Sequence, residues 1–231
     1  MNNLDEIISK IEKQMDDKER TREIAIRYSR NIIITCRKSM QHLHQGHFRE
    51  AEDLLRRSSA TLKELCDTTK AYPDLTNAGF VENAAQEFVE AQCLINILQG
   101  KDLPDPDTIQ TSYSSYLEGL CDVVGELRRK ALDTILNGDP KEAYQYLKIM
   151  EEIYDSILRF DYPSSLIPIK RKQDVARSLI EKTRGEMAVA SCEQRIEYRT
   201  EEFRKLVNEM NEEKAHRVEQ KKQELDIDRV W

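Results

Sequence analysis

The sequence is poor in residues that end helices and has no long apolar run. Its 231 residues include only seven glycines and six prolines, which predicts long elements separated by few turns. The longest purely aliphatic run is three isoleucines at positions 32–34. Because a membrane-spanning helix needs about 20 apolar residues, we expect no membrane span. The first residues, MNNLDEIISK, hold no basic stretch followed by an apolar one, so we expect no secretory signal.

The cysteines follow no known pattern. The five cysteines are odd in number, widely spaced and without a Cys-x-x-Cys motif: Cys36, Cys66, Cys93, Cys121 and Cys192. This usage favours free, mostly buried thiols over a disulfide framework. The expected location is therefore the reducing cytoplasm.

Charged residues, by contrast, are abundant. They make up 34% of the chain against 39% hydrophobic residues, a balance typical of long helices with wide solvent-facing sides. The net charge is −7. That surplus argues against nucleic-acid binding over the whole surface, although a local basic stripe can still bind phosphates.

Apolar spacing and turn residues divide the chain into helices. We expect the first helix to begin at Asn3, with Glu6 as a capping-box partner, and the fourth to be capped by Asp107. The predicted helices cover residues 3–46, 48–70, 77–99 and 107–137, then one opening at Pro140 and one continuing from about 166 past 184. No strand pattern or fixed repeat occurs. The fold class is therefore an all-α bundle of about six to seven long helices.

The composition changes near residue 186, where a charge-rich stretch begins. We expect a main helical domain over residues 1–185 and a charged helical extension over 186–231. The extension has a thin apolar seam, as in an extended or coiled-coil tail. The seam consists of Ile196, Phe203, Leu206, Met210 and Val218.

Two acidic pairs lie on neighbouring predicted helices. Glu87 and Glu90 border the apolar stripe of the third helix, and their spacing of three residues lets them converge. Asp122 and Glu126, at i and i+4 on the fourth helix, lie nearly opposite its apolar stripe, which predicts a polar face. Each pair taken alone is most simply a solvated flank.

Together, four carboxylates suit a hard divalent cation such as Mg²⁺ or Mn²⁺. Such a cation can activate water for phosphodiester hydrolysis. A di-iron bundle is the competing metal site, and it requires Glu-x-x-His. Glu90 stands where that motif needs His, which argues against iron.

Several motifs resemble the translin family of all-helical nucleic-acid-binding proteins. They are QEFVEA at 86–91, SYLEGLCDVVGELRR at 115–129, NGDP at 137–140 and KTRGE at 182–186, and the resemblance covers most of residues 15–185. Translin itself is the non-catalytic branch of that family, whereas the translin-associated branch carries acidic ribonuclease residues. Glu87, Glu90, Asp122 and Glu126 match the catalytic pattern.

The resemblance implies a metal-dependent endoribonuclease, with these four carboxylates as catalytic and metal-binding residues. It also implies a closed homo-oligomer, most often an octamer, with Asp122 and Glu126 facing its hollow interior. The alternative is a non-catalytic scaffold that binds RNA or single-stranded DNA.

A basic stripe on the first helix is the candidate RNA surface. Its members fall within about 100° of arc: Arg20, Arg27, Arg30, Arg37 and Lys38. Such a stripe can bind phosphates. The alternative is a solvated face paired with Asp17, Glu19 and Glu23. Weaker candidates are Arg56, Arg57, Arg128 and Arg129.

The histidines of HLHQGH at 42–47 do not match a known structural zinc motif. A positive charge near a helix C-terminus is the simpler explanation for them. Tyr113 and Tyr116 precede the second acidic pair, and we expect them to be packing residues.

Overall fold

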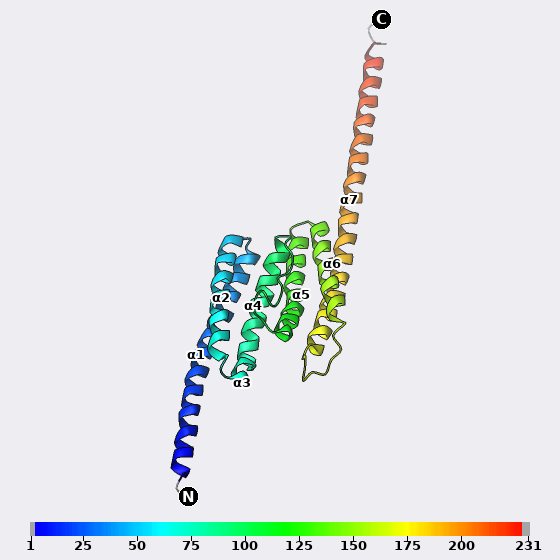
Figure 1. The fold of residues 1–231 in the computed structure, drawn as a ribbon. Coiled ribbons are helices and arrows are strands. Elements are labelled where there is room, and N and C mark those ends of the chain that lie inside the picture. The colour runs from blue at the N-terminus through cyan, green and yellow to red at the C-terminus, as the bar shows by residue number, and fades with distance from the viewer. Residues whose placement is uncertain (1–2, 228–231) are drawn as a thin grey trace. The chain divides into compact units, whose positions relative to one another are not determined.

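The computed structural model describes residues 3–227, with side chains as far as residue 218, and contains helices but no strands within that range. The elements, in chain order (Figure 1), are α1 (Leu4–His44), α2 (Phe48–Thr69), α3 (Pro73–Thr76), α4 (Gly79–Leu98), α5 (Tyr113–Leu136), α6 (Pro140–Ile157) and α7 (Lys170–Ile227). The all-α prediction is confirmed. Within the described residues, no helix is long and apolar enough to cross a membrane.

The chain divides into two compact units, Met1–Thr183 and Arg184–Trp231. The first unit holds α1 to α6 and the opening turns of α7. The second consists of the remainder of α7. Residues 228–231, the end of the predicted extension, lie outside the described residues.

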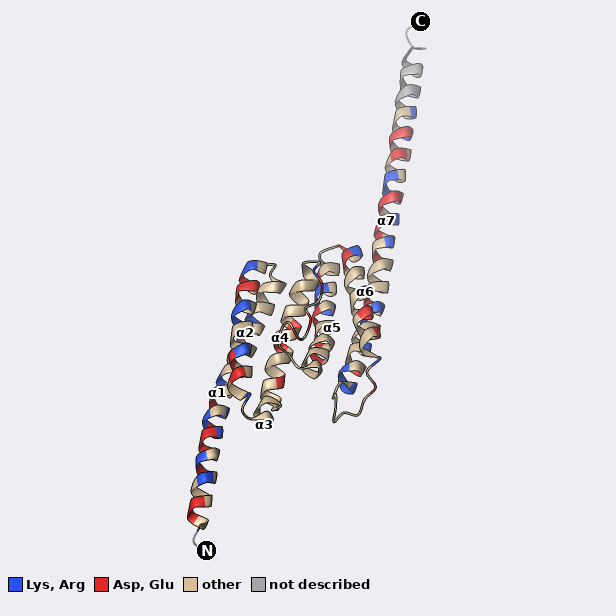
Figure 2. Ribbon diagram, in the orientation of Figure 1, with Lys and Arg blue, Asp and Glu red and all other residues tan. Residues whose placement is uncertain are grey.

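The first unit is a bundle in which α4 is the central helix. Helix α4 packs against α1, α2 and α5, and α5 in turn packs against α6. Its predicted apolar stripe is buried as expected: Ala84, Phe88, Ala91 and Ile95 are all at most 2% exposed. Figure 2 shows few charged residues on α4 compared with α1. The charges that α4 does carry therefore lie beside a tightly packed core.

A close approach between α4 and α5 occurs at Gly119. A Cβ atom built there would lie 2.7 Å from Cγ1 of Val89 and 3.0 Å from the carbonyl oxygen of Gln86. Only glycine therefore allows this helix separation. The contact brings the acidic faces of α4 and α5 to adjacent positions.

Helix α1 has two distinct parts. Residues 3–17 are exposed on all sides and extend beyond α2 and α4 (Figure 1). From Ala25 onward, one face is buried against α2 and α4, through Ala25, Ser29, Ile32, Cys36, Ser39 and Leu43. The residues on the other side of this half remain available to solvent.

The predicted helix ends are correct where glycine or proline marks them and wrong where only a polar cap was expected. Gly138 has φ +83°, and Asp139 caps α6 by accepting from the backbone N–H of Glu142. Helix α5, however, begins at Tyr113 with Ser112 as its cap. Asp107 lies in the preceding turn, where Asp105 accepts from its backbone N–H. A local Asx turn thus outcompetes the predicted cap.

Two smaller predictions are also wrong. Asn3 is the N-terminal cap residue of α1, but its side chain makes no capping hydrogen bond. Tyr113 is 63% exposed and is therefore no packing residue. Tyr116 is half-buried and donates to the carbonyl oxygen of Pro104, at 2.7 Å.

Candidate functional site

The four acidic residues lie on the facing sides of α4 and α5. Glu87 and Glu90 come from the middle of α4, beside the buried Phe88 and Val89. Asp122 and Glu126 come from the middle of α5, and their side chains are only 30% and 27% exposed. The sequence predicts a polar face for this second pair, and in the structure polar side chains of α1, α4 and α7 contact it.

Each of three carboxylates contacts a basic side chain from another helix. Arg37 of α1 donates to Oε1 of Glu87 at 2.9 Å. His44, also on α1, lies 2.5 Å from Oε2 of Glu126 through its Nε2 atom. The ammonium group of Lys172, on α7, is 2.7 Å from Oδ2 of Asp122.

Asp122 has a second polar neighbour on α4. The side-chain amide of Gln86 donates to its Oδ2 atom at 2.5 Å. Gln86 precedes Glu87 directly, so one turn of α4 contacts the carboxylates of both helices. This contact depends on the short α4–α5 separation at Gly119.

Glu90 lies among the other three carboxylates. Burial, and after it the neighbouring charges of Asp122, Glu126 and Glu87 in that order, raise the pKa of its carboxyl group to about 8. The protein therefore keeps Glu90 protonated at neutral pH. The cluster therefore combines two ion pairs, one histidine–carboxylate contact and one neutral acid.

Glu126 responds in the opposite direction. Its hydrogen bond with His44 lowers the pKa of the Glu126 carboxyl group, against the opposing effect of burial. The two glutamates thus have pKa values that are shifted apart by their surroundings. Such a difference between adjacent acids is typical of functional sites, although structural ion-pair networks also produce it.

A cavity of about 610 Å³ opens between α1, α4 and α5 at this point. Its acidic lining includes Glu87, Glu90 and Glu126, and its basic lining includes Arg37 and Arg129. Asp122 is outside this lining and lies on the side nearer Lys172. The cavity presents carboxylates and guanidinium groups side by side, which suits a ligand that combines a cation with phosphate.

The carboxyl oxygens are the donors that Mg²⁺ and Mn²⁺ prefer. In the described part of the chain, no group of three or more His, Cys, Asp and Glu residues is arranged to hold a metal ion. The ion pairs explain this, since they turn three of the four carboxylates toward basic partners. The carboxylate donors would suit a divalent cation once these basic partners turned away.

The basic stripe lies on the exposed side of α1. Arg20, Arg27 and Arg37 expose 76%, 75% and 69% of their side chains, and Arg30 and Lys38 are also exposed. Arg20 and Arg27 make only long ion pairs, of 3.7 and 3.8 Å, with Asp17 and Glu23 of the same helix. Arg37 joins the stripe to the cavity, because it belongs to both.

Sequence reasoning missed His44 and Lys172. His44 could have been found, because it lies on the same face of its helix as Arg37. The residues of this face follow the spacing +3, +1, +3 and line one side of the cavity: Arg37, Met40, Gln41 and His44. Such spacing is a helical pattern that can be read from the sequence. Lys172 comes from a helix whose register against α5 no local pattern specifies, so no comparable signal existed for it.

Comparison with known proteins gives consistent matches. The model of the Translin family matches residues 1–189. An uncharacterised protein of Methanocaldococcus jannaschii, MJ0175, is 32% identical over 173 residues, which are 74% of this chain and 77% of that protein.

Solved structures with similar folds are C3PO proteins. The structure of an AfC3PO–duplex RNA complex has a TM-score of 0.70 and 31% identity, covering 80% of this chain and 96% of that chain. A crystal structure of AfC3PO has a TM-score of 0.71 and 31% identity, with 80% and 97% covered. Apo-NeC3PO, at 20% identity and a TM-score of 0.68, shares the fold, with 82% and 98% covered. From the family match and these relatives, we conclude that the chain belongs to the translin family.

Proposed function

We propose that this protein binds RNA and cleaves it as a metal-dependent endoribonuclease. The observation that carries the proposal is the cavity in which Glu87, Glu90 and Glu126 lie beside Arg37 and Arg129. The AfC3PO relative, solved with duplex RNA, supports RNA as the ligand. The four matched acidic residues support hydrolysis as the reaction.

The residues that would hold Mg²⁺ or Mn²⁺ are Glu87, Glu90, Asp122 and Glu126. These residues would thereby place a divalent ion whose chemistry, when bound, would be activation of water and neutralisation of charge on the phosphodiester. Glu90, whose pKa is raised by burial and then by the neighbouring carboxylates, would lose its proton on loading, because a nearby cation favours the charged form. Metal binding should therefore release a proton and become tighter as pH rises.

The basic residues have a second task once the carboxylates turn to a cation. Arg37 is exposed over 69% of its side chain, so it can leave Glu87 and contact a phosphate without disturbing the core. Guanidinium groups bind phosphate oxygens in a bidentate manner. Arg37 and Arg129 would then hold the phosphodiester at the cavity, while Arg20, Arg27, Arg30 and Lys38 contact the flanking backbone.

Self-association completes the proposal. The exposed part of α1 carries apolar side chains in the spacing +4, +3, +4, at Leu4, Ile8, Ile11 and Met15, each between 46% and 49% exposed. Such a stripe favours helix packing with another copy. We expect a closed homo-oligomer, most simply an octamer, and light scattering that gives a monomer at micromolar concentration would contradict it.

A non-catalytic scaffold for RNA or single-stranded DNA is the second candidate. The ion pairs that occupy Glu87, Asp122 and Glu126 favour it, because they neutralise the carboxylates without any metal. Labelled single-stranded RNA incubated with Mg²⁺ or with EDTA separates the two. Cleavage only with Mg²⁺ supports the nuclease, whereas binding without turnover in both conditions supports the scaffold.

A further inference from the structure

The second unit carries an apolar seam that no described residue covers. Val189, Ile196, Phe203 and Met210 are seven residues apart and between 57% and 67% exposed. Cys192 and Leu206, three residues after the first and third of them, are exposed too. A seven-residue repeat of this kind is typical of the a and d positions of a coiled coil.

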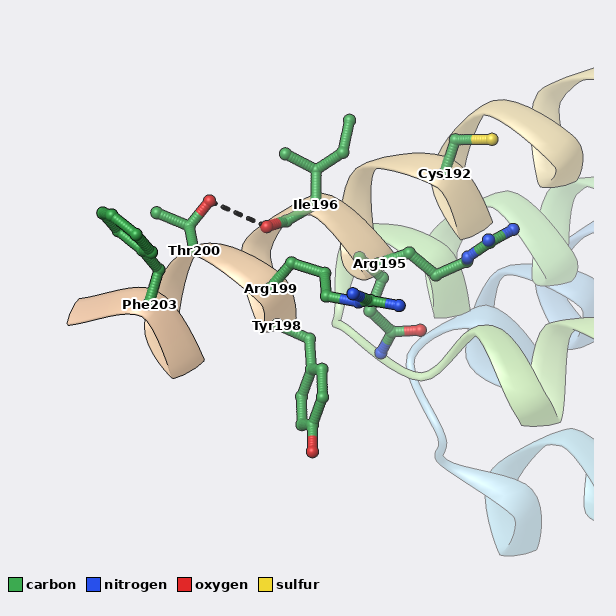
Figure 3. Close-up of a pocket in the computed structure, with 8 residues that line it drawn as sticks. Cys192, Arg195, Ile196, Tyr198, Arg199, Thr200 and Phe203 are labelled. Carbon is green, nitrogen blue, oxygen red and sulfur yellow. Dashed lines mark hydrogen bonds between the residues drawn. The ribbon is translucent and has the colours of Figure 1, made fainter. Parts of the chain in front are cut away.

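Figure 3 shows how these side chains lie. Cys192, Ile196 and Thr200 point to one side of α7, and Tyr198 points to the other. Open space of about 900 Å³ borders this stretch, and the described residues that line it belong to α7 between Cys192 and Phe203. This space is open to solvent on its outer side, where a second helix would pack.

We propose that residues 189–213 pair with the same segment of a second copy as an antiparallel coiled coil. The partner is a second copy of this chain, because the apolar and charged positions of the segment are complementary to those of the same segment running in the opposite direction. This interaction surface is independent of the proposed nuclease function. It lies almost wholly beyond residues 1–189, which the family model matches.

Charge excludes the parallel, in-register arrangement. Arg199 and Glu213 occupy d positions of the repeat. In a parallel dimer each would meet its own copy in the core layer, which places like charges together. Burying like charges side by side is costly.

An antiparallel register separates these like charges. When Arg195 of one helix lies opposite Glu209 of the other, four core layers form between the two copies of residues 189–213, and the outermost pairs Val189 with Glu213 at the end of the segment. Cys192 meets Met210, Ile196 meets Leu206, and Arg199 meets Phe203. The layer of Arg199 and Phe203 stacks a guanidinium group on an aromatic ring. By two-fold symmetry each of these contacts occurs twice.

Cysteine cross-linking tests the register directly. The experiment uses the full chain with Cys66→Ser, which removes a partly exposed thiol. In this background, Met210→Cys should give a covalent dimer in a glutathione redox buffer. The bond would join Cys192 of one copy to position 210 of the other. Removing the native thiol with Cys192→Ser should abolish that dimer, because the two 210 positions lie about 27 Å apart along the pair.

Charge exchange provides the second readout. Arg195→Glu in the Met210→Cys protein should reduce cross-linking, since it places two glutamates opposite one another. Adding Glu209→Arg should restore it. Cross-linking by the native Cys192 alone, or by Met210→Cys with Cys192→Ser, would indicate a parallel pair and overturn the proposal. Absence of a covalent dimer in the Met210→Cys protein, with its helical content unchanged, would overturn it as well.

Discussion

The Nε2 atom of His44, near the end of α1, lies 2.5 Å from Oε2 of Glu126 in the middle of α5. This contact joins the histidine-rich end of the first helix to the acidic site. Arg37, two turns earlier on α1, reaches Glu87 on α4. Helix α1 therefore carries both the basic stripe and two partners of the carboxylates, so changes on it should affect RNA binding and site stability together.

Removing the His44 side chain should destabilise the metal-free protein. His44 is only 9% exposed, and its loss leaves the half-buried Glu126 without its principal partner. We expect His44→Ala to lower the free energy of unfolding by about 1–3 kcal/mol. A carboxyl group with a lowered pKa stabilises the folded protein at pH values above its ordinary pKa of 4.5. That stabilisation is lost as the pH falls through the folded-state pKa. Urea unfolding should thus show a lower unfolding free energy for His44→Ala than for the wild type at pH 6.5, and this difference should shrink below pH 4. A difference that is the same at both pH values would contradict this account.

Glu90 should make the metal-free protein less stable as pH rises. Its pKa is raised to about 8, so between the ordinary value of 4.5 and about 8 the unfolded chain releases a proton that the folded protein keeps. The unfolding free energy should fall across that window, by at most about 1.4 kcal/mol per pH unit. Glu90→Gln cannot ionise and should remove this slope. Unfolding in EDTA at pH 5.5 and 7.5 checks it, and equal slopes in both proteins would show that Glu90 is ionised throughout.

Reversing two charges of the basic stripe should weaken RNA binding. Arg27→Glu with Arg30→Glu should lower affinity and make the dependence of log K on log salt shallower by about 1.4, if both residues contact single-stranded phosphates. The matched control is Lys63→Glu with Lys70→Glu, which makes the same charge change at an exposed position of α2 and at its exposed C-cap. Fluorescence anisotropy at several salt concentrations measures both. Equal losses in the two double variants would point to net charge instead of a stripe.

Gly119 and Gly125 provide a matched pair on one helix. Gly119→Ala should destabilise the protein by about 1–3 kcal/mol, since the new Cβ overlaps Val89 and forces α4 and α5 apart. Gly125→Ala meets only Leu179, at 3.8 Å, and should be neutral or stabilising by up to about 1 kcal/mol through helix propensity. Thermal unfolding of both variants tests this. If Gly119→Ala unfolds like Gly125→Ala, the helices do not approach as closely as described.

Much of the fold could be predicted because its signals are local. Apolar spacing along α4 identifies its buried face, and Gly138 with Pro140 identifies a helix end. The start of α5 could not be predicted in the same way. Asp107 and Ser112 are both good caps, and the choice between them depends on the turn that Asp105 forms.

The sequence patterns single out the four acidic residues and Arg37, but not His44 or Lys172. The positions of Glu87 and Glu90 can be predicted because both border the apolar stripe of α4. The burial of Asp122 depends on Lys172, which is 50 positions away, and no periodicity within α5 reports a neighbour from another helix. Long-range contacts of this kind are the part of the site that a local pattern cannot supply.

The most direct test of the central claim is a paired assay of RNA binding and RNA cleavage with Glu126→Gln. This change keeps the size and polarity of the side chain and removes the charge that a cation needs. The wild-type protein should cleave labelled RNA in Mg²⁺. The variant should bind RNA with similar affinity, yet lose more than the 10–100-fold in rate that loss of an outer-shell partner typically costs. If Glu126→Gln cleaves at the wild-type rate in Mg²⁺, the carboxylates do not perform the reaction and the scaffold function is the correct one.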